Sequence, residues 1–334
     1  MNRRQPPSDE QQTSAPAKAA RAVLMIRPAA FGRNEVTRPT NRFQSPKEIV
    51  DPQRAAAAAV AEFDNCVTAL RARGVDVHVF EGRTTTTLPD EVFPNNWITT
   101  HPDGMAVLYP MMAWNRRQER RRDILEQLQQ QADGFRIDRL IDLSPLEEQN
   151  LFLEGTGSLV FDHANRLAYA CLSPRTHADA LREFARQADF DVVHFLAQDG
   201  DGHAIYHTNV MMSVGETFAI ICAESIPAVD ERLRILTRLE RSGREIIEFG
   251  LNQLSTFVGN MLQLRTGESH VIAMSRKAYA SLTDSQRLAL GRHGEFVVAD
   301  IPTIEACGGG SVRCMLAELL TPRKQQPAGT ILVD

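Results

Sequence analysis

The stretch Phe93-Pro-Asn-Asn-Trp-Ile-Thr-Thr100 places a polar side chain directly before an apolar run, and this layout recurs four more times along the chain. The other copies are FLEGTGSL (152–159), YHTNVMMS (206–213), VGNMLQL (258–264) and VRCMLAEL (312–319). The polar residues that precede the runs are separated by 58, 53, 53 and 54 residues; they are Asn96, Glu154, His207, Asn260 and Cys314. A fixed period of this length is typical of repeat folds that stack or close on themselves.

Each of the first four copies is followed by a second apolar run, an amphipathic helix and a further strand, and one more helix and strand precede the first copy. The expected helices begin near residues 52, 115, 176, 227 and 283, and the expected strands cover 75–80, 136–141, 191–196, 245–249 and 295–299. In the helix expected over 227–242, a period of about 3.6 residues places Val229, Leu233, Leu236 and Leu239 on the core side. We therefore predict an α/β fold, a five-bladed α/β propeller of pseudo-fivefold ββαβ repeats, with a closing strand at 330–333.

Composition limits the class of protein. The chain has 334 residues, 43% of them apolar, with 37 Lys and Arg against 42 Asp and Glu. This balance argues against a nucleic-acid partner, and the chain has neither a membrane-spanning apolar stretch nor a secretion signal. Five scattered cysteines favour a reduced, cytoplasmic protein. Residues 1–20 are polar and Pro-rich, which predicts a flexible tail before a single catalytic domain at 21–334.

In a ring of equivalent units, the five polar residues would face one axis. That arrangement brings together a thiol, an imidazole, a carboxylate and two amides. A Cys314 thiolate is a soft nucleophile, His207 can exchange its proton, and Glu154 can accept N–H bonds from a planar amidine or urea. The glycine run centred on Gly309 would let the backbone approach a ligand and leave N–H groups free.

The motifs FPNNW, LEGTGS, YHTN and CGGGSVRCM resemble those of the guanidine-group-modifying superfamily, over about residues 22–334. This superfamily includes arginine deiminases, dimethylarginine hydrolases and amidinotransferases. The resemblance implies the five-bladed propeller, with Cys314 as nucleophile, His207 as general acid and base, and Glu154 as the carboxylate that binds the guanidine group. We predict no cofactor and no metal site, and a small-molecule amino acid as substrate.

Two positions depart from the arginine deiminase pattern, since Asn96 and Asn209 stand where those enzymes usually carry Asp. Amides cannot neutralise a guanidinium, but they can donate to a carbonyl oxygen. A neutral ureido amino acid is therefore favoured, and the pattern is similar to a subgroup associated with citrulline hydrolysis. Cys314 would attack the ureido carbon, His207 would protonate the departing amine, and water would then release carbamate.

The α-carboxylate of such a substrate requires a cation. The segment 115–122 carries five arginines, and the resemblance implies Arg116 or Arg117, since family members place an arginine in this region to bind the substrate carboxylate. A solvated helix face is the simpler interpretation of the same arginines.

Several alternatives stay open. Within enzymes, an arginine or methylarginine deiminase or hydrolase, or an amidinotransferase, would use the same three groups. A non-enzymatic binding protein on the same fold is a more distant alternative. Cys66, Cys171 and Cys222 are interpreted as core residues. Cys307 and Cys314 could form a disulfide or a metal pair, but their spacing matches no common zinc pattern. His194 and His203 lie close in sequence and are a second candidate for a metal site. The role of Asn260 and a homo-oligomeric state are left open.

Overall fold

The computed structural model describes residues 18–45, 51–131 and 133–324. These residues form five three-stranded sheets, each built in the same way. In each sheet the central strand runs antiparallel to one neighbour and parallel to the other. A helix connects the two parallel strands in each repeat, as a parallel crossover requires.

The sheets follow the predicted period. The first contains β15 (Ala317–Leu319), β1 (Ala22–Arg27) and β2 (Asp76–Glu81), with helix α1 (Pro52–Ala72). The second contains β3 (Ile98–Thr100), β4 (Met105–Leu108) and β5 (Arg139–Asp142), with α2 (Arg122–Gln130). The third contains β6 (Val160–Asp162), β7 (Leu167–Cys171) and β8 (Asp191–Phe195), with α4 (Ala178–Ala188).

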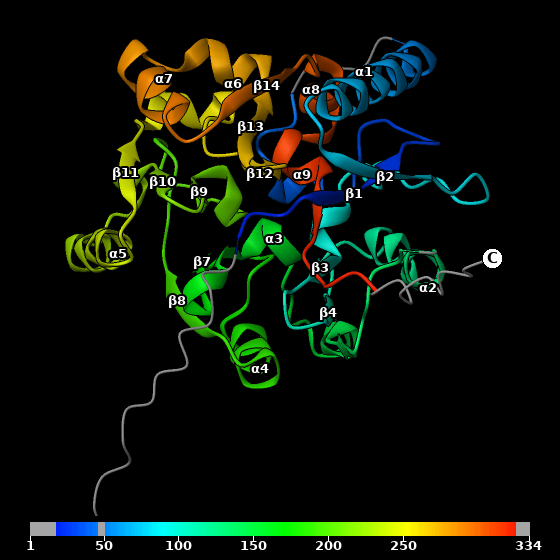
Figure 1. Cartoon of the computed structure of the whole chain (residues 1–334), viewed down its shortest axis with the longest axis horizontal. Coiled ribbons are helices and arrows are strands. Elements are labelled where there is room, and N and C mark those ends of the chain that lie inside the picture. The colour runs from blue at the N-terminus through cyan, green and yellow to red at the C-terminus, as the bar shows by residue number, and fades with distance from the viewer. Residues whose placement is uncertain (1–17, 46–50, 132, 325–334) are drawn as a thin grey trace, which may run out of the picture.

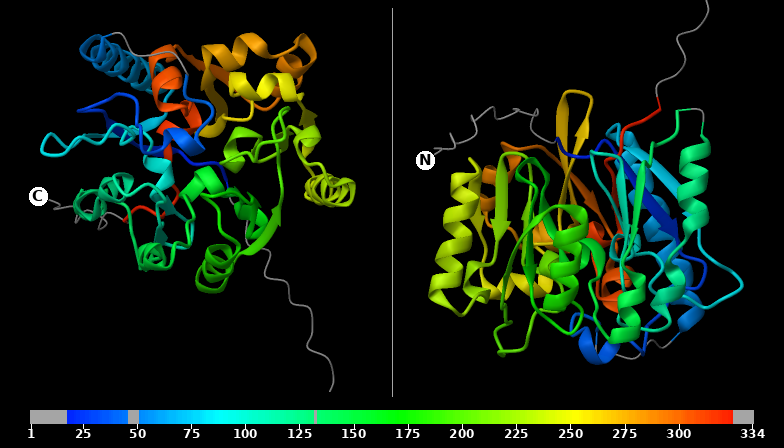
Figure 2. Two further views of the ribbon diagram at one scale, coloured as in Figure 1. Left: turned by 180° about the vertical axis from the view of Figure 1, so that it is seen from behind. Right: turned by 90° about the horizontal axis from the view of Figure 1, so that it is seen from below.

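The fourth sheet contains β9 (Met212–Val214), β10 (Phe218–Ile221) and β11 (Glu245–Glu248), with α5 (Val229–Arg241). The fifth contains β12 (Leu262–Thr266), β13 (Ser269–Ser275) and β14 (Glu295–Ala299), with α6 (Arg276–Ser281) and α7 (Asp284–Gly291). Three further short helices, α3 (Gly155–Ser158), α8 (Pro302–Gly308) and α9 (Val312–Met315), complete the described helices. Figure 1 shows α1, α2, α4, α5 and α7 at the periphery and α3 and α9 near the centre, and Figure 2 shows the same groups from behind and below.

The two ends of the described chain meet in one sheet. Ala22 of β1 pairs with Leu319 of β15, so the first repeat takes its antiparallel strand from the C-terminal part of the chain. The closing strand predicted at 330–333 lies outside the described residues. The antiparallel partner of β1 is instead Ala317–Leu319, which begins three residues after Cys314.

Two expectations about local structure are corrected, and a third lies largely outside the described residues. The helix expected from residue 115 is a 3-10 turn (Arg116–Glu119) followed by α2, because Arg116 turns into the protein. In α5, Val229 and Leu233 are about half exposed, at 54% and 55%, because the buried side of the helix carries Ile235 and Leu239. Residues 1–17 of the predicted tail lie outside the described residues, but Ala20 is buried against the apolar core.

The buried side chains support the remaining expectations. Phe63 and Leu70 of α1 are fully buried, seven residues apart on one side of the helix. Cys66, Cys171 and Cys222 are buried core residues as well. In the part of the chain that the structure describes, no helix combines the length and the apolar character that a membrane span requires.

Candidate functional site

Short helical segments bring the polar repeat residues together. Helix α3 contacts both the 3-10 turn Pro94–Asn96 and the 3-10 turn Thr208–Val210, and α9 contacts the first of these turns. The side chains that the period aligns are all buried, with 0–4% of each residue exposed: Asn96, Glu154, His207, Asn260 and Cys314. The repeat therefore places its chemistry in one enclosed region.

The Cys314 thiol lies between two amides. Nδ2 of Asn260 lies 3.3 Å from Sγ of Cys314, and Nδ2 of Asn209 lies 3.5 Å from the same sulfur. Asn260 also donates to the backbone carbonyl of Asn209 at 3.1 Å, which fixes the two amides relative to each other. Asn260, whose role the sequence left open, therefore holds the sulfur in place, and N–H donors of this kind stabilise a thiolate.

His207 is held by Glu154. Its Nε2 lies 2.9 Å from Oε2 of Glu154, and Oε1 of Glu154 accepts the backbone N–H of Met112 at 3.0 Å. The ring of Tyr206 packs on the imidazole with centroids 4.5 Å apart. A Cβ at Gly157 would lie 2.7 Å from two ring atoms of His207, so glycine is required for this close approach.

Burial lowers the pKa of His207 to about 4, although the Glu154 carboxylate acts in the opposite direction. The pKa of Glu154 is lowered to about 2, because the neighbouring Arg175 and His207 outweigh its burial. At neutral pH, the site therefore holds a neutral imidazole that accepts a proton and a carboxylate that orients it.

This depressed pKa predicts a pH-dependent stability. Between the ordinary value of 6.5 and about 4, the unfolded chain binds a proton on this imidazole that the folded protein does not bind. The free energy of unfolding is therefore expected to fall as the pH is lowered through this window. Urea unfolding of the wild type and of His207→Gln across the window measures the effect, which should be smaller in the variant. Equal pH slopes in both proteins would contradict it.

Arg116 lies inside the site and is already paired. Its guanidinium donates to both oxygens of Glu119, with the shortest contact at 2.8 Å, and to Oδ1 of Asn96 at 3.0 Å. It also lies 3.6 Å from Asp90 and 3.9 Å from Glu154. The expectation that Arg116 grips a substrate carboxylate is therefore corrected, because its donors are engaged by buried protein acceptors.

The same contact orients Asn96. Arg116 donates to Oδ1 of Asn96, so the Nδ2 group of Asn96 points away from Arg116. This nitrogen has no partner among the described protein atoms. A Cβ at Gly157 would lie 2.5 Å from this nitrogen and 2.7 Å from the His207 ring, so both groups border the same point. The amide of Asn96 is thus a free donor beside the imidazole.

Arg117 is in a different position, with 32% of its side chain exposed. It lies 3.4 Å from Glu147, and it donates to the backbone carbonyl of Met111 at 3.1 Å. Glu147 also accepts from Arg120 at 3.0 Å, so one carboxylate serves two guanidinium groups. This part of the site keeps a surplus positive charge.

The sequence analysis missed three buried charged residues, which are Arg175, Asp90 and Glu119. Arg175 contacts Glu154 at 3.5 Å, lies over the Tyr206 ring at 4.9 Å and donates to the carbonyl of Thr37 at 3.1 Å. The period contained the signal, because Arg175 follows Glu154 by 21 residues as Arg116 follows Asn96 by 20.

Gly309 does not leave its N–H group free. It ends α8 with a left-handed φ of 64°, and its N–H donates to the carbonyl of Glu305 at 3.0 Å. Its own carbonyl accepts the hydroxyl of Tyr206 at 2.7 Å. The expected ligand contact is corrected, because the conformation of the glycine serves the helix end. Cys307 and Cys314 are both free thiols, so the disulfide alternative is wrong.

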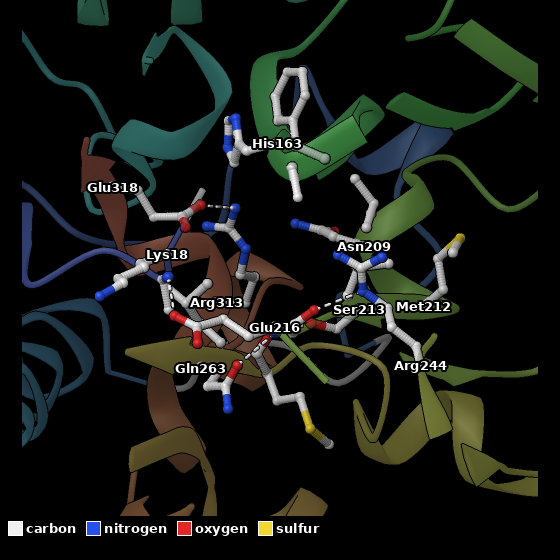
Figure 3. A pocket seen from close by; sticks show the side chains of 18 residues that line it. Lys18, His163, Asn209, Met212, Ser213, Glu216, Arg244, Gln263, Arg313 and Glu318 are labelled. Atoms are coloured by element: carbon white, nitrogen blue, oxygen red, sulfur yellow. Dashed lines mark hydrogen bonds and ion pairs between the residues drawn. The ribbon is translucent and has the colours of Figure 1, made fainter. Parts of the chain in front are cut away.

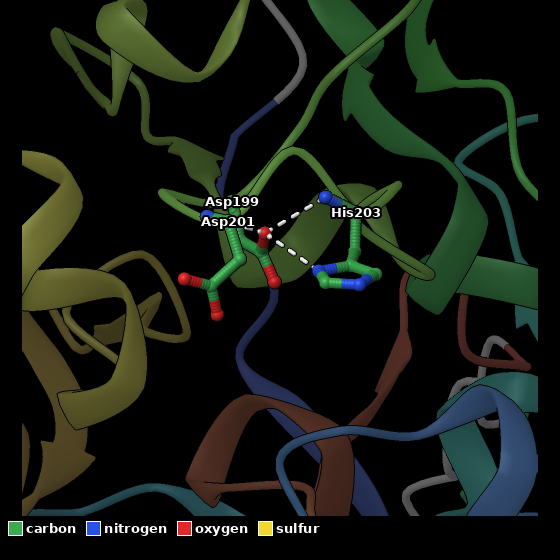
Figure 4. Close-up of side chains that lie close together, drawn as sticks. All are labelled: Asp199, Asp201 and His203. Carbon is green, nitrogen blue, oxygen red and sulfur yellow. Dashed lines mark hydrogen bonds and ion pairs between the residues drawn. The ribbon is translucent and has the colours of Figure 1, made fainter.

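One side-chain group in the described ranges has the geometry of a metal site. The candidate ligand atoms of Asp199, Asp201 and His203 lie within 4.8 Å of one another (Figure 4). The guanidinium of Arg42 lies 3.9 Å from Asp199 and 3.6 Å from Asp201, so it balances much of their charge. His194, which the sequence analysis paired with His203, is not part of this group.

A known protein family matches most of the chain. The family model described as N,N dimethylarginine dimethylhydrolase, eukaryotic, matches residues 27–321. No curated protein sequence matches the chain.

Solved structures share the fold. An arginine dihydrolase from the ornithine–ammonia cycle in cyanobacteria superposes with a TM-score of 0.69 at 16% identity, over 90% of this chain and 41% of that one. This chain therefore spans about two fifths of the length of that protein. The N-terminal domain of the same dihydrolase, as a variant bound to substrate, gives 0.67 at 18% identity, over 90% of this chain and 98% of the domain. A dimethylarginine dimethylaminohydrolase variant in an adduct with S-methyl-L-thiocitrulline gives 0.59 at 14%, over 90% and 99%.

Proposed function

Because the chain belongs to the N,N-dimethylarginine dimethylhydrolase family, we propose that it hydrolyses a C–N bond of a ureido or guanidino amino acid through Cys314. The observation that carries this proposal is the enclosed arrangement of a thiol between two amides together with a His207–Glu154 pair. A thiol, a base and a group that orients the base are the parts that covalent catalysis requires.

The fold proposed for this site is a closed five-bladed propeller. Five sheets of one topology and the pairing of β1 with β15 support closure, since the first and last segments meet in one sheet. In such a ring, the residues before the inner strands β3, β6, β9, β12 and β15 lie around one axis.

The charges of the site favour a neutral substrate. Three buried carboxylates, Asp90, Glu119 and Glu154, lie near two buried guanidinium groups, Arg116 and Arg175. Burial raises the pKa of Glu119 to about 8 and also raises the pKa of Asp90. Asp90 and Glu119 face Arg116, and Glu154 faces Arg175, so each carboxylate already has a guanidinium partner. A guanidinium ion would find no unbalanced anion here, whereas a ureido group needs none.

Citrulline has the required chemistry, since its ureido group is planar and uncharged and carries one carbonyl oxygen. Nδ2 of Asn96 is a free donor for that oxygen. The Cys314 thiol gives its proton to His207, and its sulfur bonds to the ureido carbon. The same proton then passes from His207 to the departing nitrogen as the C–N bond breaks, which releases ornithine and leaves an S-carbamoyl group on Cys314. Water then bonds to the carbon of the S-carbamoyl group, its proton goes to His207, and the C–S bond returns its electron pair to sulfur. The carbamate breaks down to CO2 and ammonia.

Glu154 acts through His207 in this mechanism. Its oxygens already accept from His207 and from the backbone of Met112, so its first role is to orient the imidazole and to stabilise the imidazolium that forms. Its remaining lone pairs can still accept N–H bonds from the substrate.

Arginine or a methylarginine is the second candidate. The family match supports this alternative, because the family is named after the hydrolysis of dimethylarginine. An amidinotransferase would differ in resolving the intermediate with an amine in place of water. A binding protein without catalysis would leave the arrangement of Cys314, His207 and Glu154 without a purpose.

The charge at positions 96 and 209 is expected to determine whether the enzyme prefers citrulline or arginine. In the double variant Asn96→Asp with Asn209→Asp, the ratio of kcat/KM for arginine to that for citrulline should rise by about tenfold or more, because paired carboxylates bind guanidinium through charge-assisted bonds. The matched control replaces both residues by Ser, which removes the amides without adding charge. A ratio that does not rise in the Asp variant would contradict the role of charge.

Arg117 is proposed to bind the substrate carboxylate, because Glu147 balances only one of the two guanidinium groups around it. Arg117→Ala should raise KM for citrulline by about tenfold, the value of one charge-assisted pair. The same variant should leave KM unchanged for the ureido compound that lacks the carboxylate. An equal rise for both compounds would show that Arg117 acts on the structure of the site.

We also propose that the protein acts in a reducing compartment such as the cytoplasm, since none of its five cysteines forms a disulfide. Self-association stays a prediction.

A product assay tests the proposed function. Purified protein is incubated separately with citrulline, arginine, methylarginines and agmatine, and ornithine, citrulline and ammonia are measured. Ornithine formed fastest from citrulline supports the ureido hydrolase. Citrulline formed from arginine or methylarginine supports the second candidate, and the absence of product from every compound would contradict both.

A further inference from the structure

A cavity beside the proposed catalytic residues is large enough to hold a small organic molecule. It has a volume of about 830 Å³, which is typical of small-molecule sites, and we call it the lateral cavity. Its walls come from residues 42–45 and 199–201, the 3-10 segment Leu251–Thr256 and the helices α6 and α8, which Figure 1 shows near each other at one edge of the molecule. By contrast, the cavity in Figure 3 has a volume of about 60 Å³, which holds only a few water molecules.

Five of the seven charged side chains in the wall of the lateral cavity are paired with one another. The guanidinium of Arg42 lies 3.9 Å from the carboxylate of Asp199 and 3.6 Å from that of Asp201. The guanidinium of Arg276 lies 3.7 Å from the carboxylate of Asp300. Each of these groups therefore has a counterion in the wall itself. The two charged side chains that remain carry opposite charges.

These two side chains, Lys277 and Glu305, have no ion-pair partner among the described residues. The ammonium of Lys277 donates to the carbonyl of Ser255 at 2.7 Å and lies 5.2 Å from the centroid of the Phe257 ring. Glu305 is only 4% exposed, and its carboxylate accepts the hydroxyl of Ser311 at 2.6 Å. Burial raises the pKa of Glu305, and the charge of Lys277 offsets part of this effect, so the two groups lie within electrostatic reach of each other. A ligand with both an ammonium and a carboxylate would supply the counterion that each group lacks.

The uncharged part of the wall adds an acceptor and an apolar surface. Gln44 is 5% exposed, its Nε2 donates to the hydroxyl of Thr37 at 3.0 Å, and its Oε1 has no partner among the described protein atoms. A buried acceptor at the wall of a cavity is a binding position for an N–H group of a ligand. The apolar residues of the wall are Phe43, Leu251, Leu254, Ile301 and Pro302. An apolar side chain of a ligand would bury its surface against them.

We propose that the lateral cavity is a second binding site, which takes an α-amino acid with an apolar side chain. The ammonium group of this ligand pairs with Glu305 and donates to Oε1 of Gln44, and its carboxylate pairs with Lys277. The ligand differs in class from the substrate of the proposed function, because its side chain carries no ureido or guanidino group.

Glu305 connects the lateral cavity with the proposed nucleophile. Ser311, whose hydroxyl bonds to Glu305, directly precedes helix α9, and its carbonyl accepts the backbone N–H of Cys314 at 2.9 Å. An ammonium group bound to Glu305 competes with the Ser311 hydroxyl for the same carboxylate. Occupancy of the cavity is therefore expected to disturb the start of α9 and to lower turnover, and this part of the inference rests on the proposed function.

Calorimetric titration of the full chain with L-phenylalanine tests the binding site. We expect saturable binding of L-phenylalanine. Binding should be weaker by about tenfold or more for 3-phenylpropionate, which lacks the ammonium group that meets the buried Glu305. It should be weaker by about threefold for phenylalaninamide, which lacks the carboxylate that meets the exposed Lys277. No saturable binding of L-phenylalanine up to its solubility limit, or equal affinity for the three compounds, would overturn the site.

Variants of the two charged residues test the assigned contacts. Glu305→Gln keeps an acceptor for Ser311 but removes the charge, and it should weaken binding of L-phenylalanine by about tenfold or more. Lys277→Met keeps an unbranched side chain without the ammonium group, and it should weaken binding by about threefold. Lys277→Arg is the matched control, because it keeps the charge and should stay within about twofold of the wild type. Lys277 is exposed, so its variants report on the site even if Glu305→Gln is destabilised in thermal unfolding. Unchanged affinity in both Glu305→Gln and Lys277→Met would overturn the proposal.

Steady-state kinetics with the preferred substrate tests the connection to Cys314. Saturating L-phenylalanine should lower kcat of the wild type by about threefold or more with little change in KM, and the effect should be absent in Glu305→Gln. A rise in KM alone would show that L-phenylalanine competes in the catalytic site, and unchanged constants would refute the connection through Ser311. Failure of the proposed function looks different, because the wild type would then give no product from any of the tested compounds, whereas the titration with L-phenylalanine would still report on the lateral cavity.

Discussion

Replacement of Cys314 by serine is expected to lower kcat by about 10⁴-fold or more, because no other described group near the His207–Glu154 pair supplies a comparable nucleophile. The serine hydroxyl is a much weaker nucleophile than a thiolate near neutral pH. The substitution removes little volume, so the variant should fold and still bind substrate. Turnover is measured as ornithine formation, and binding as the thermal shift that the substrate produces.

Cys307→Ser is the matched control for this experiment. Cys307 is also a free, buried thiol, and it lies in α8, seven residues before Cys314 in the chain. It forms no bond with His207 or Glu154, so the variant should keep most of the wild-type kcat. A Cys314→Ser protein that still turns over at a rate similar to that of Cys307→Ser would refute the assigned nucleophile.

Replacement of His207 by asparagine is expected to lower kcat by about 10²–10⁴-fold, the usual contribution of a general acid and base. Asparagine retains a polar group beside Glu154 but cannot carry the proton. KM should change little if the imidazole acts in the chemical steps. Steady-state kinetics with the preferred substrate measures both constants.

His203→Asn serves as the control, because His203 belongs to the same repeat but lies on an exposed loop beside Asp199. Its kcat should match that of the wild type. A similar loss in both variants would show that the effect comes from disturbance of the repeat and not from proton transfer at His207.

The period of the chain is the feature that made the site predictable. Aligning the polar residue before each inner strand identified Cys314, His207, Glu154, Asn96 and Asn260, and the structure places all five in one buried region. The period of the sequence carries this information because the same position in each repeat takes a similar place around the fold. The same reasoning predicted the succession of strand, strand, helix and strand along the chain, but it expected the closing strand at 330–333, whereas β1 pairs with Ala317–Leu319.

The charged network around these residues could not be predicted in the same way. Arg116 was expected on a solvated helix face or at a substrate carboxylate, but it is buried against Glu119 and Asp90. Its environment depends on a 3-10 turn that directs the side chain inward, and on carboxylates from other segments. Local sequence does not encode which arginine of a basic segment finds buried acceptors.

Helix α5 shows a related limit. Its apolar residues repeat with helical spacing over more than one side, and the sequence analysis placed Val229, Leu233, Leu236 and Leu239 on the core side. Leu239 is buried as predicted, but Val229 and Leu233 are about half exposed, and Ile235 is buried instead. The position of the neighbouring sheet determines which side of α5 is buried. The spacing of apolar residues within one helix does not carry that information.

The most direct test of the central claim is the mass of the protein quenched during turnover. With citrulline, we expect the mass to rise by one carbamoyl group, located by peptide mapping on the peptide that contains Cys314, and to stay unchanged in Cys314→Ser. Ornithine formation without any modification of Cys314, or with the modification on another residue, would contradict the account.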